Sequence, residues 1–144
     1  MNNNQKTAGI SKVLYTAKTR TMGGRQGNSK SDDGNLDLLL SPPGSHTPGT
    51  NPEQLFAAGW SACYIGALGL AAKKSGTIIP SDTYVDAEVD LGMNDGVFLL
   101  QARLTISLPG LDKNIAEQLI KLAHQTCPYS KAIHGNINVT TTLI

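Results

Sequence analysis

A run of nineteen residues without a charge, residues 54–72, constrains the fold of this chain more than any other feature. Just before it, Asn51 can cap a helix and Pro52 suits the first helical position, while Gly76 can end the helix. A helix this apolar must either cross a membrane or lie buried in a protein core. Its glycines and polar side chains lower its hydropathy, and the surrounding strands need a core. We therefore predict a buried central helix over residues 51–74.

Alternation of apolar and polar residues predicts five strands around this helix. They cover residues 12–22, 36–40, 83–91, 100–108 and 137–143, with a glycine-rich turn at 23–27 and a hairpin turn at 92–96. Residues 112–127 carry apolar side chains at helical spacing and predict a second, amphipathic helix, which Pro128 breaks or restarts. The order of two strands, helix, two strands, helix and strand predicts an α+β fold with a largely antiparallel sheet.

The composition excludes several classes of protein. The 12 basic and 11 acidic residues leave a net charge of +1, which is too little to attract nucleic acid or an anionic membrane. The first residues, Met1 to Lys6, are polar and do not open a signal peptide, so we expect a cytoplasmic protein with no membrane segment. A length of 144 residues is typical of one domain. We expect a single domain over residues 1–144, with residues 1–10 as a flexible tail.

The two cysteines, Cys63 and Cys127, are too few for a disulfide scaffold and fit two interpretations. Both can be small apolar packing residues, since each lies on a predicted helix. Alternatively, the first helix breaks at Gly59 and restarts with Ser61 as its cap. This would place Cys63 at a helix N-terminus, where the pKa of its thiol is lowered and the thiolate becomes a nucleophile. Because two apolar helices of one small core pack together, the two cysteines could also meet.

Four motifs stand out along the chain: GGR at 23–25, NPEQLFAAGWSAC at 51–63, HQTCPYS at 124–130 and HGNINV at 134–139. Together they closely resemble the organic hydroperoxide resistance proteins, a branch of the Ohr/OsmC peroxidase family, and the resemblance covers essentially the whole chain. It implies an OsmC-like fold in an intertwined homodimer, with the sheets packed on the long central helix. Two residues depart from the family pattern, because Trp60 stands where Tyr is frequent and His134 where Arg is frequent.

The resemblance implies a thiol peroxidase that reduces organic hydroperoxides. Cys63 matches the peroxidatic cysteine, which the hydroperoxide oxidises to a sulfenic acid, and Cys127 matches the resolving cysteine, which then forms a disulfide with it. Arg25 matches the arginine that stabilises the thiolate, and Glu53 matches the glutamate that orients this arginine. No bound cofactor or metal is implied. The implied reductant is dihydrolipoamide or the dihydrolipoyl group of a lipoylated protein.

The position of Glu53 in this scheme raises a geometric problem. An unbroken helix would place Glu53 about 15 Å from Cys63 along the helix axis, which is too far for one tight cluster. Three solutions are open: the helix breaks near Gly59, Arg25 spans the gap, or one of the groups comes from a second subunit of the homodimer.

The residues near Cys63 in the sequence are apolar and predict a pocket that favours alkyl, aryl or lipid hydroperoxides over hydrogen peroxide. Each of them could equally belong to the core. They are Leu55, Phe56, Trp60, Tyr64 and Ile65.

Other functions are open as well. A cysteine hydrolase could pair His124 with Cys127, which lie three residues apart on one helix. A metal site would have to combine the cysteines with His46, His124 and His134, which show no zinc-binding spacing beyond that one pair. A non-enzymatic dimeric binding module would use both cysteines for packing only. Within the family, a peroxidase of the OsmC subgroup with the same fold is the nearest alternative.

Overall fold

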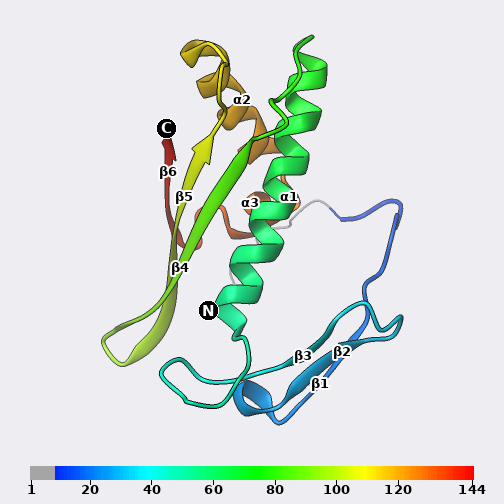
Figure 1. Ribbon diagram of the computed structural model, residues 1–144, viewed down its shortest axis with the longest axis vertical. Coiled ribbons are helices and arrows are strands. Elements are labelled where there is room, and N and C mark those ends of the chain that lie inside the picture. Colours follow the sequence, from blue (N-terminus) through cyan, green and yellow to red (C-terminus); the bar gives the residue numbers. More distant parts are fainter. Residues whose placement is uncertain (1–8) are drawn as a thin grey trace. The chain divides into compact units, whose positions relative to one another are not determined.

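Residues 9–144 are described by a computed structural model of the chain (Figure 1). They divide into two compact units, of which the first ends at Thr50 and the second is Asn51–Ile144. Most of the predicted tail over residues 1–10 lies outside the described residues. The expectation of one domain over residues 1–144 stays a prediction.

The first unit contains a small antiparallel sheet with the strand order β1-β2-β3. β1 (Thr19–Met22) pairs with β2 (Asn28–Ser31), which pairs with β3 (Asp37–Leu39). The sequence predicted the first strand over residues 12–22, but only its last four residues pair with another strand of the described chain. The prediction missed β2, because the sequence of this strand, NSKS, has no alternation of apolar and polar residues.

The glycine-rich turn predicted at residues 23–27 is confirmed and joins β1 to β2 through the short 3₁₀ turn η1 (Gly24–Gln26). Gly23 has a φ of 72°, in the left-handed region that favours glycine. At Gly27, a Cβ atom would lie 1.7 Å from a backbone oxygen of β1, so a larger residue does not fit there. These two glycines allow the tight backbone path that carries Arg25.

The second unit begins with the long helix α1 (Pro52–Lys74), as the sequence predicted. The side chain of Asn51 accepts a hydrogen bond from the backbone N–H of Gln54 at 2.8 Å and thereby caps the helix. By length and composition the helix could cross a membrane, but a buried core helix has the same properties. In this chain, one face of α1 is buried in the core. The buried residues of that face are Trp60, Tyr64, Ala67, Leu68, Ala71 and Ala72.

The sheet of the second unit has the strand order β4-β5-β6. β4 (Tyr84–Asn94) and β5 (Val97–Ser107) form an antiparallel hairpin, and β6 (Asn138–Leu143) pairs with β5 in parallel. The turn of the hairpin is shorter than predicted, because only Asp95 and Gly96 separate the strands and both have positive φ values. Three of the four strand pairings in residues 9–144 are antiparallel, so the sheets are largely antiparallel, as predicted.

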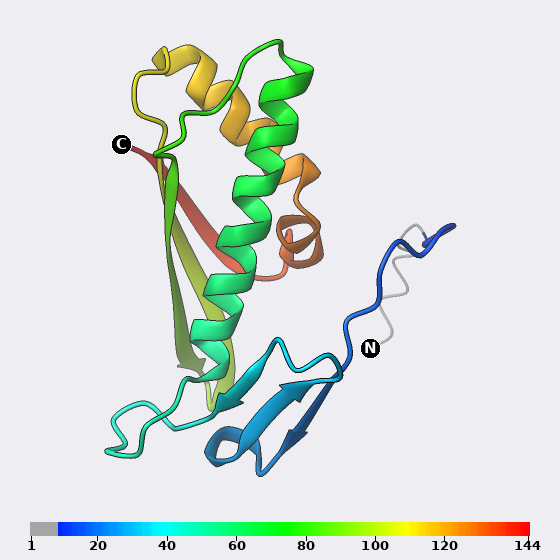
Figure 2. The same ribbon diagram turned by 45° about the vertical axis from the view of Figure 1, so that its right-hand side comes forward.

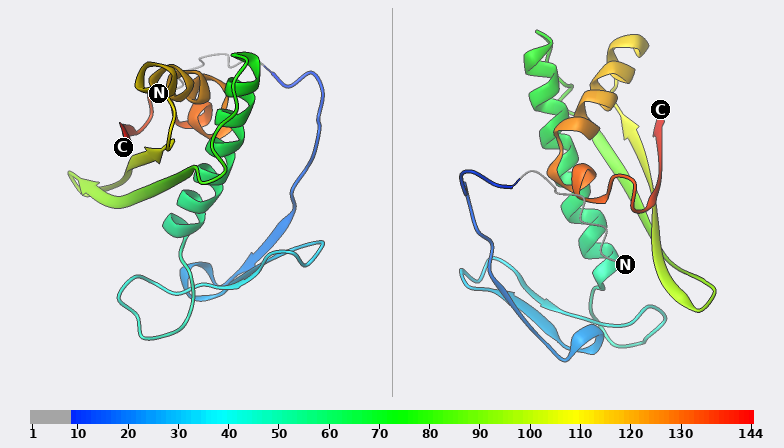
Figure 3. Two further views of the ribbon diagram at one scale, coloured as in Figure 1. Left: turned by 45° about the horizontal axis from the view of Figure 1, so that its top comes forward. Right: turned by 180° about the vertical axis from the view of Figure 1, so that it is seen from behind.

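Two helices connect β5 to β6 and make their parallel pairing possible. α2 (Lys113–Thr126) begins at Asp112, whose side chain accepts hydrogen bonds from two backbone N–H groups of the first turn. α3 (Pro128–Ile133) is separated from α2 by Cys127 alone. The back view in Figure 3 shows the path from α2 through α3 into β6. The sequence left open whether Pro128 ends or restarts the helix, and the structure shows that it restarts it.

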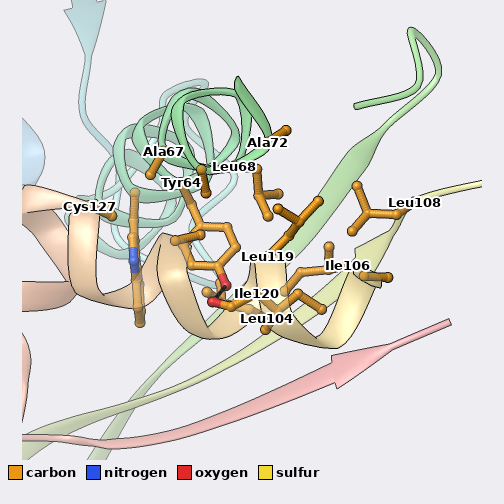
Figure 4. Close-up of a cluster of buried hydrophobic side chains, with 14 of the residues drawn as sticks. Tyr64, Ala67, Leu68, Ala72, Leu104, Ile106, Leu108, Leu119, Ile120 and Cys127 are labelled. Atoms are coloured by element: carbon orange, nitrogen blue, oxygen red, sulfur yellow. Dashed lines mark hydrogen bonds between the residues drawn. The ribbon is translucent and has the colours of Figure 1, made fainter. Parts of the chain in front are cut away.

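α1 and α2 lie together on one face of the β4-β5-β6 sheet (Figure 2). The core between them consists of apolar side chains from both helices and from β5 (Figure 4). The hydroxyl of Tyr64 lies in this core and donates a hydrogen bond to the backbone oxygen of Ile120 at 2.9 Å. This is the predicted α+β fold, with a sheet packed on the central helix and on the amphipathic helix. The intertwined homodimer stays a prediction.

Candidate active site

The structure brings the two cysteines into contact. Cys63 lies in the middle of α1, and Cys127 lies at the junction between α2 and α3. The thiol of Cys127 donates towards the Sγ atom of Cys63, and the two sulfur atoms are 3.4 Å apart. Cys127 is fully buried and Cys63 is half-buried. The expectation that packing of the two helices could bring the cysteines together is confirmed.

A disulfide between these residues needs only a small movement. The S–S distance of a disulfide is about 2.05 Å, so the sulfur atoms would have to approach each other by about 1.4 Å from their separation of 3.4 Å. Cys127 is suited to such a shift, because it has an extended backbone between two helices and is not inside either of them. The geometry therefore fits a dithiol that converts to a disulfide.

The alternative in which α1 breaks near Gly59, which the sequence left open, is excluded. The helix is continuous, and the hydroxyl of Ser61 donates to the backbone oxygen of Ala57 at 2.8 Å, as it does in a helix interior. Ser61 is therefore not a helix cap, and Cys63 is not at the N-terminus of its helix. The reason for a glycine at position 59 is tertiary packing: a Cβ atom there would lie 2.9 Å from the hydroxyl oxygen of Tyr129 in α3.

A broken helix would have lowered the pKa of the Cys63 thiol. In the continuous helix, the environment of Cys63 has the opposite effect. Burial raises this pKa above its ordinary value, and the hydrogen bond with Cys127 raises it further. The backbone N–H of Tyr129 acts in the opposite direction, because it donates to the sulfur of Cys63 and favours the thiolate. A thiol with a raised pKa is mostly protonated at neutral pH. Nucleophilic chemistry at Cys63 therefore requires a cation that stabilises the thiolate.

The continuous helix also removes one of the three explanations for how Glu53 could act in the same site as Cys63. Glu53 lies in the first turn of α1, ten residues before Cys63, and so is separated from it by about 15 Å along the axis. The solution in which the helix breaks is excluded. The other two, an arginine that spans the gap or a group from a second subunit, stay open. Arg25 lies in η1 of the first unit, and the roles assigned to Arg25 and Glu53 stay predictions.

The other two arginines of the chain lie on strands. Arg103 in β5 forms ion pairs with Glu88 at 3.1 Å and with Asp90 at 2.7 Å across the hairpin. The hydrogen bond from Arg103, and next the one from Gln101, hold the pKa of the Asp90 carboxyl well below its ordinary value. Arg20 is exposed on β1.

The predicted apolar pocket around Cys63 is only partly supported. Trp60 and Tyr64 are fully buried and pack in the core. Leu55, Phe56 and Ile65 are half-buried and can contact a ligand. The cavity that Trp60 does line has a volume of about 430 Å³ and holds neither cysteine.

Sequence reasoning missed a partly buried network of polar side chains beside the cysteines. The indole N–H of Trp60 donates to the hydroxyl of Ser130 at 3.0 Å, and Ser130 Oγ lies 3.2 Å from Nδ1 of His124. Nε2 of His124 lies 2.8 Å from the hydroxyl of Thr141. The one available signal was the motif HQTCPYS, in which His124 and Ser130 flank Cys127 at equal spacing.

Two of the alternative functions, the cysteine hydrolase and the metal site, can be compared with the structure. Both ring nitrogens of His124 have hydrogen-bond partners other than Cys127, so the geometry does not present the pair as nucleophile and base. Burial lowers the pKa of His124, with a smaller contribution from the charge of His134. Within residues 9–144, the side chains of His, Cys, Asp and Glu form no group of three or more that could hold a metal ion.

Comparison with known proteins places the chain among one group of relatives. Residues 43–142 match the family described as OsmC-like protein. The organic hydroperoxide resistance protein of Xanthomonas axonopodis pv. citri (strain 306) is 46% identical over 136 residues, which cover 92% of this chain and 96% of the relative.

Solved structures agree with the sequence comparison. The organic hydroperoxide resistance protein OhrB of Bacillus subtilis is 42% identical and superposes with a TM-score of 0.86, over 92% of this chain and 100% of that chain. An organic hydroperoxide resistance protein from Elizabethkingia anophelis, with a crystallant-derived thiocyanate bound, is also 42% identical. It superposes with a TM-score of 0.84 over 92% of this chain and 97% of that chain.

Proposed function

The chain belongs to the family of OsmC-like proteins, with organic hydroperoxide resistance proteins among its relatives, and on that premise we propose that it is a thiol peroxidase. Its substrates are organic hydroperoxides, which it reduces to alcohols. The observation that carries the proposal is the contact between Cys63 and Cys127, whose sulfur atoms are 3.4 Å apart in a partly buried position. Two cysteines used only for packing would not need to face each other.

In the first step, the thiolate of Cys63 attacks the outer oxygen of the hydroperoxide. The O–O bond breaks, the leaving alkoxide takes a proton to become an alcohol, and Cys63 is left as a sulfenic acid. Cys63 is the better candidate for this role, because it is half-buried whereas Cys127 is fully buried. The backbone N–H of Tyr129 supports it, since this group favours the thiolate.

In the second step, the thiol of Cys127 attacks the sulfenic sulfur of Cys63. An S–S bond forms and the hydroxyl group leaves with the thiol proton as water. The approach of about 1.4 Å that this bond requires is small, and the disulfide protects Cys63 from further oxidation by excess hydroperoxide.

The thiolate of Cys63 needs a positive partner, and Arg25 is the residue that we assign to this role. The raised pKa of the Cys63 thiol supports the need for such a partner, because burial alone would keep it protonated. Glu53 orients the guanidinium of Arg25 in this scheme.

The oxidised protein returns to its dithiol form by exchange with an external dithiol, and no bound cofactor takes part. We assign this role to a dihydrolipoyl group, on free dihydrolipoamide or on a lipoylated protein. The group reduces the Cys63–Cys127 disulfide by thiol–disulfide exchange and is released as the cyclic lipoyl disulfide.

The protein acts as a cytoplasmic homodimer. Exposed apolar side chains support the dimer: Val13, Leu14 and Tyr15, in the segment predicted as strand, are 68%, 87% and 79% exposed in the single chain. Phe98, near the turn of the β4–β5 hairpin, is 68% exposed. Association of two copies would cover such surfaces. The reducing cytoplasm is also the compartment in which a dithiol is kept available for catalysis.

A coupled assay tests the proposed function. Consumption of cumene hydroperoxide is measured with dihydrolipoamide as the reductant, for wild type, Cys63→Ser and Cys127→Ser. We expect sustained turnover in wild type, no turnover in Cys63→Ser and loss of most turnover in Cys127→Ser. Turnover in Cys63→Ser equal to wild type would contradict the proposal and favour a binding module with packing cysteines. Turnover with thioredoxin but not with dihydrolipoamide would contradict the assigned reductant only.

A further inference from the structure

A chain of hydrogen bonds links four elements beside the cysteines. Trp60 in α1 donates its indole N–H to Ser130 in α3, Ser130 bonds to Nδ1 of His124 in α2, and Nε2 of His124 bonds to Thr141 in β6. Trp60 is fully buried and Ser130 is nearly so. A buried polar group that is left without its hydrogen-bond partner destabilises the fold, so these bonds constrain the elements that they join.

The direction of the bonds follows from the groups that are available. An indole N–H can only donate, so the oxygen of Ser130 accepts from Trp60 and its own proton can be donated to Nδ1 of His124. The neutral imidazole then carries its proton on Nε2 and donates it to the hydroxyl of Thr141. In this arrangement, each of the three bonds has one donor and one acceptor.

The hydrogen bonds of Ser130 constrain the junction between α2 and α3, where Cys127 lies. Cys127 is the single residue between α2 and α3, with an extended backbone at φ −65° and ψ 120°, so its position depends on how these two helices are held together. The bond between Ser130 and His124 crosses that junction. The bond between Ser130 and Trp60 ties α3 to the helix that carries Cys63.

The spacing of Trp60 and His124 from the cysteines also places the bonds of Ser130 close to both sulfur atoms. Trp60 lies three residues before Cys63, and His124 lies three residues before Cys127, so each is about one helical turn from a cysteine. The two bonds of Ser130 therefore fix α1, α2 and α3 to one another about one turn away from the sulfur atoms.

We propose that Ser130 is a positioning residue for the resolving step, because it clamps α3 to α1, which carries Cys63, and to α2, which ends next to Cys127, and thereby holds Cys127 against Cys63. The inference rests on the proposed function. In that step an S–S bond forms and the S–O bond of the sulfenic acid breaks. The sulfur of Cys127 is oxidised, the sulfur of Cys63 is reduced, and the thiol proton leaves with the hydroxyl group as water. No further oxidant is needed.

The experiment measures the two steps separately in Ser130→Ala. Formation of the sulfenic acid is followed in a Cys127→Ser background after mixing with cumene hydroperoxide. Formation of the disulfide is followed in the presence of Cys127 by acid quenching and intact mass. We expect Ser130→Ala to change the rate of sulfenic acid formation by less than about twofold relative to Cys127→Ser alone. The rate of disulfide formation should fall about tenfold relative to wild type, which corresponds to about 1.4 kcal/mol in the barrier.

Two control variants separate positioning from general loss of stability. Ser61→Ala removes a hydroxyl from the same helix as Cys63, but that hydroxyl bonds only to carbonyl groups of its own helix. Ile106→Val makes a small cavity in the core at β5 and destabilises the fold without touching the clamp. Both should form the disulfide at the wild-type rate. Trp60→Phe removes the donor to Ser130 together with part of the buried ring, and Ile106→Val controls for the loss of core volume. Trp60→Phe should slow disulfide formation as Ser130→Ala does, and it carries the test if Ser130→Ala does not fold.

A dithiothreitol redox buffer makes the test independent of peroxidase activity. The protein dithiol and oxidised dithiothreitol exchange to the protein disulfide and reduced dithiothreitol, and the proposal predicts a several-fold smaller disulfide fraction in Ser130→Ala. Equal rates and equal equilibria in Ser130→Ala and wild type would overturn the positioning role, as would an equal slowing in Ile106→Val. If cumene hydroperoxide does not oxidise wild type, the proposed function fails, and the dithiothreitol equilibrium still decides whether Ser130 positions Cys127.

Discussion

Two glycines of α1, Gly59 and Gly69, test whether this helix is continuous and tightly packed against α3. Replacement of either by Ala removes backbone freedom from the unfolded chain and favours the helix by about 1 kcal/mol. At Gly69, the new Cβ would lie 4.0 Å from Cδ1 of Ile79, which is an ordinary contact. Gly69→Ala should therefore stabilise the protein by about 1 kcal/mol.

At Gly59 the same gain is opposed by a clash. The new Cβ would lie 2.9 Å from the hydroxyl oxygen of Tyr129 and 3.3 Å from its Cζ atom, well inside the usual contact distance. The phenol ring must move, and overpacking of this kind costs about 1–3 kcal/mol. Gly59→Ala should therefore be neutral or destabilising by up to about 2 kcal/mol. The two variants should differ by about 1–3 kcal/mol.

Thermal unfolding of the reduced protein, at one fixed protein concentration, measures this difference. For a chain of this length, 1 kcal/mol corresponds to about 4 °C in Tm, so Gly69→Ala should melt above wild type and Gly59→Ala at or below it. In a Tyr129→Ala background the clash is absent, and Gly59→Ala should recover the gain of about 1 kcal/mol. If Gly59→Ala stabilises wild type as much as Gly69→Ala does, the account of a glycine selected for contact with α3 is wrong.

Three further results are expected. Arg25→Ala should raise the pKa of Cys63 further and slow alkylation of its thiol at pH 7 about tenfold or more, whereas Arg20→Ala, on exposed β1, should change it less than about twofold. His124 has a lowered pKa in the folded protein, so the unfolded chain binds a proton more readily. Stability should therefore fall as pH drops below about 6.5, and Tm should be lower at pH 5 than at pH 7, less so in His124→Gln. Cumene hydroperoxide should exceed hydrogen peroxide by more than about tenfold in kcat/KM, since burial of two methylene-sized groups is already worth this much. Equal values would remove the argument for an apolar binding site.

Local sequence signals predicted the parts of the fold that depend on neighbouring residues. The Asn51 cap and the proline after it located the start of α1, and the apolar spacing of residues 112–127 located α2. The strand β2 could not be found in this way, because all its side chains are polar and its pairing with β1 and β3 is what makes it a strand. Its stability comes from partners, not from its own pattern.

In the candidate site, too, contacts between residues far apart in the sequence could not be predicted from local patterns. That Cys63 and Cys127 could meet followed from two apolar helices in one small core, and their contact is confirmed. The role of Gly59 did not follow, because the residue that excludes a larger side chain, Tyr129, is seventy positions away. The bond between Trp60 and Ser130 spans the same separation. Such contacts between distant segments have no periodic signal in a single sequence.

The intact mass of the protein after one equivalent of cumene hydroperoxide tests the central claim most directly. Fully reduced wild type, Cys63→Ser and Cys127→Ser are treated in parallel. The account predicts a loss of two hydrogens in wild type, one added oxygen in Cys127→Ser and no change in Cys63→Ser. An unchanged mass in reduced wild type would show that the contact between the two cysteines is packing alone and would contradict the account.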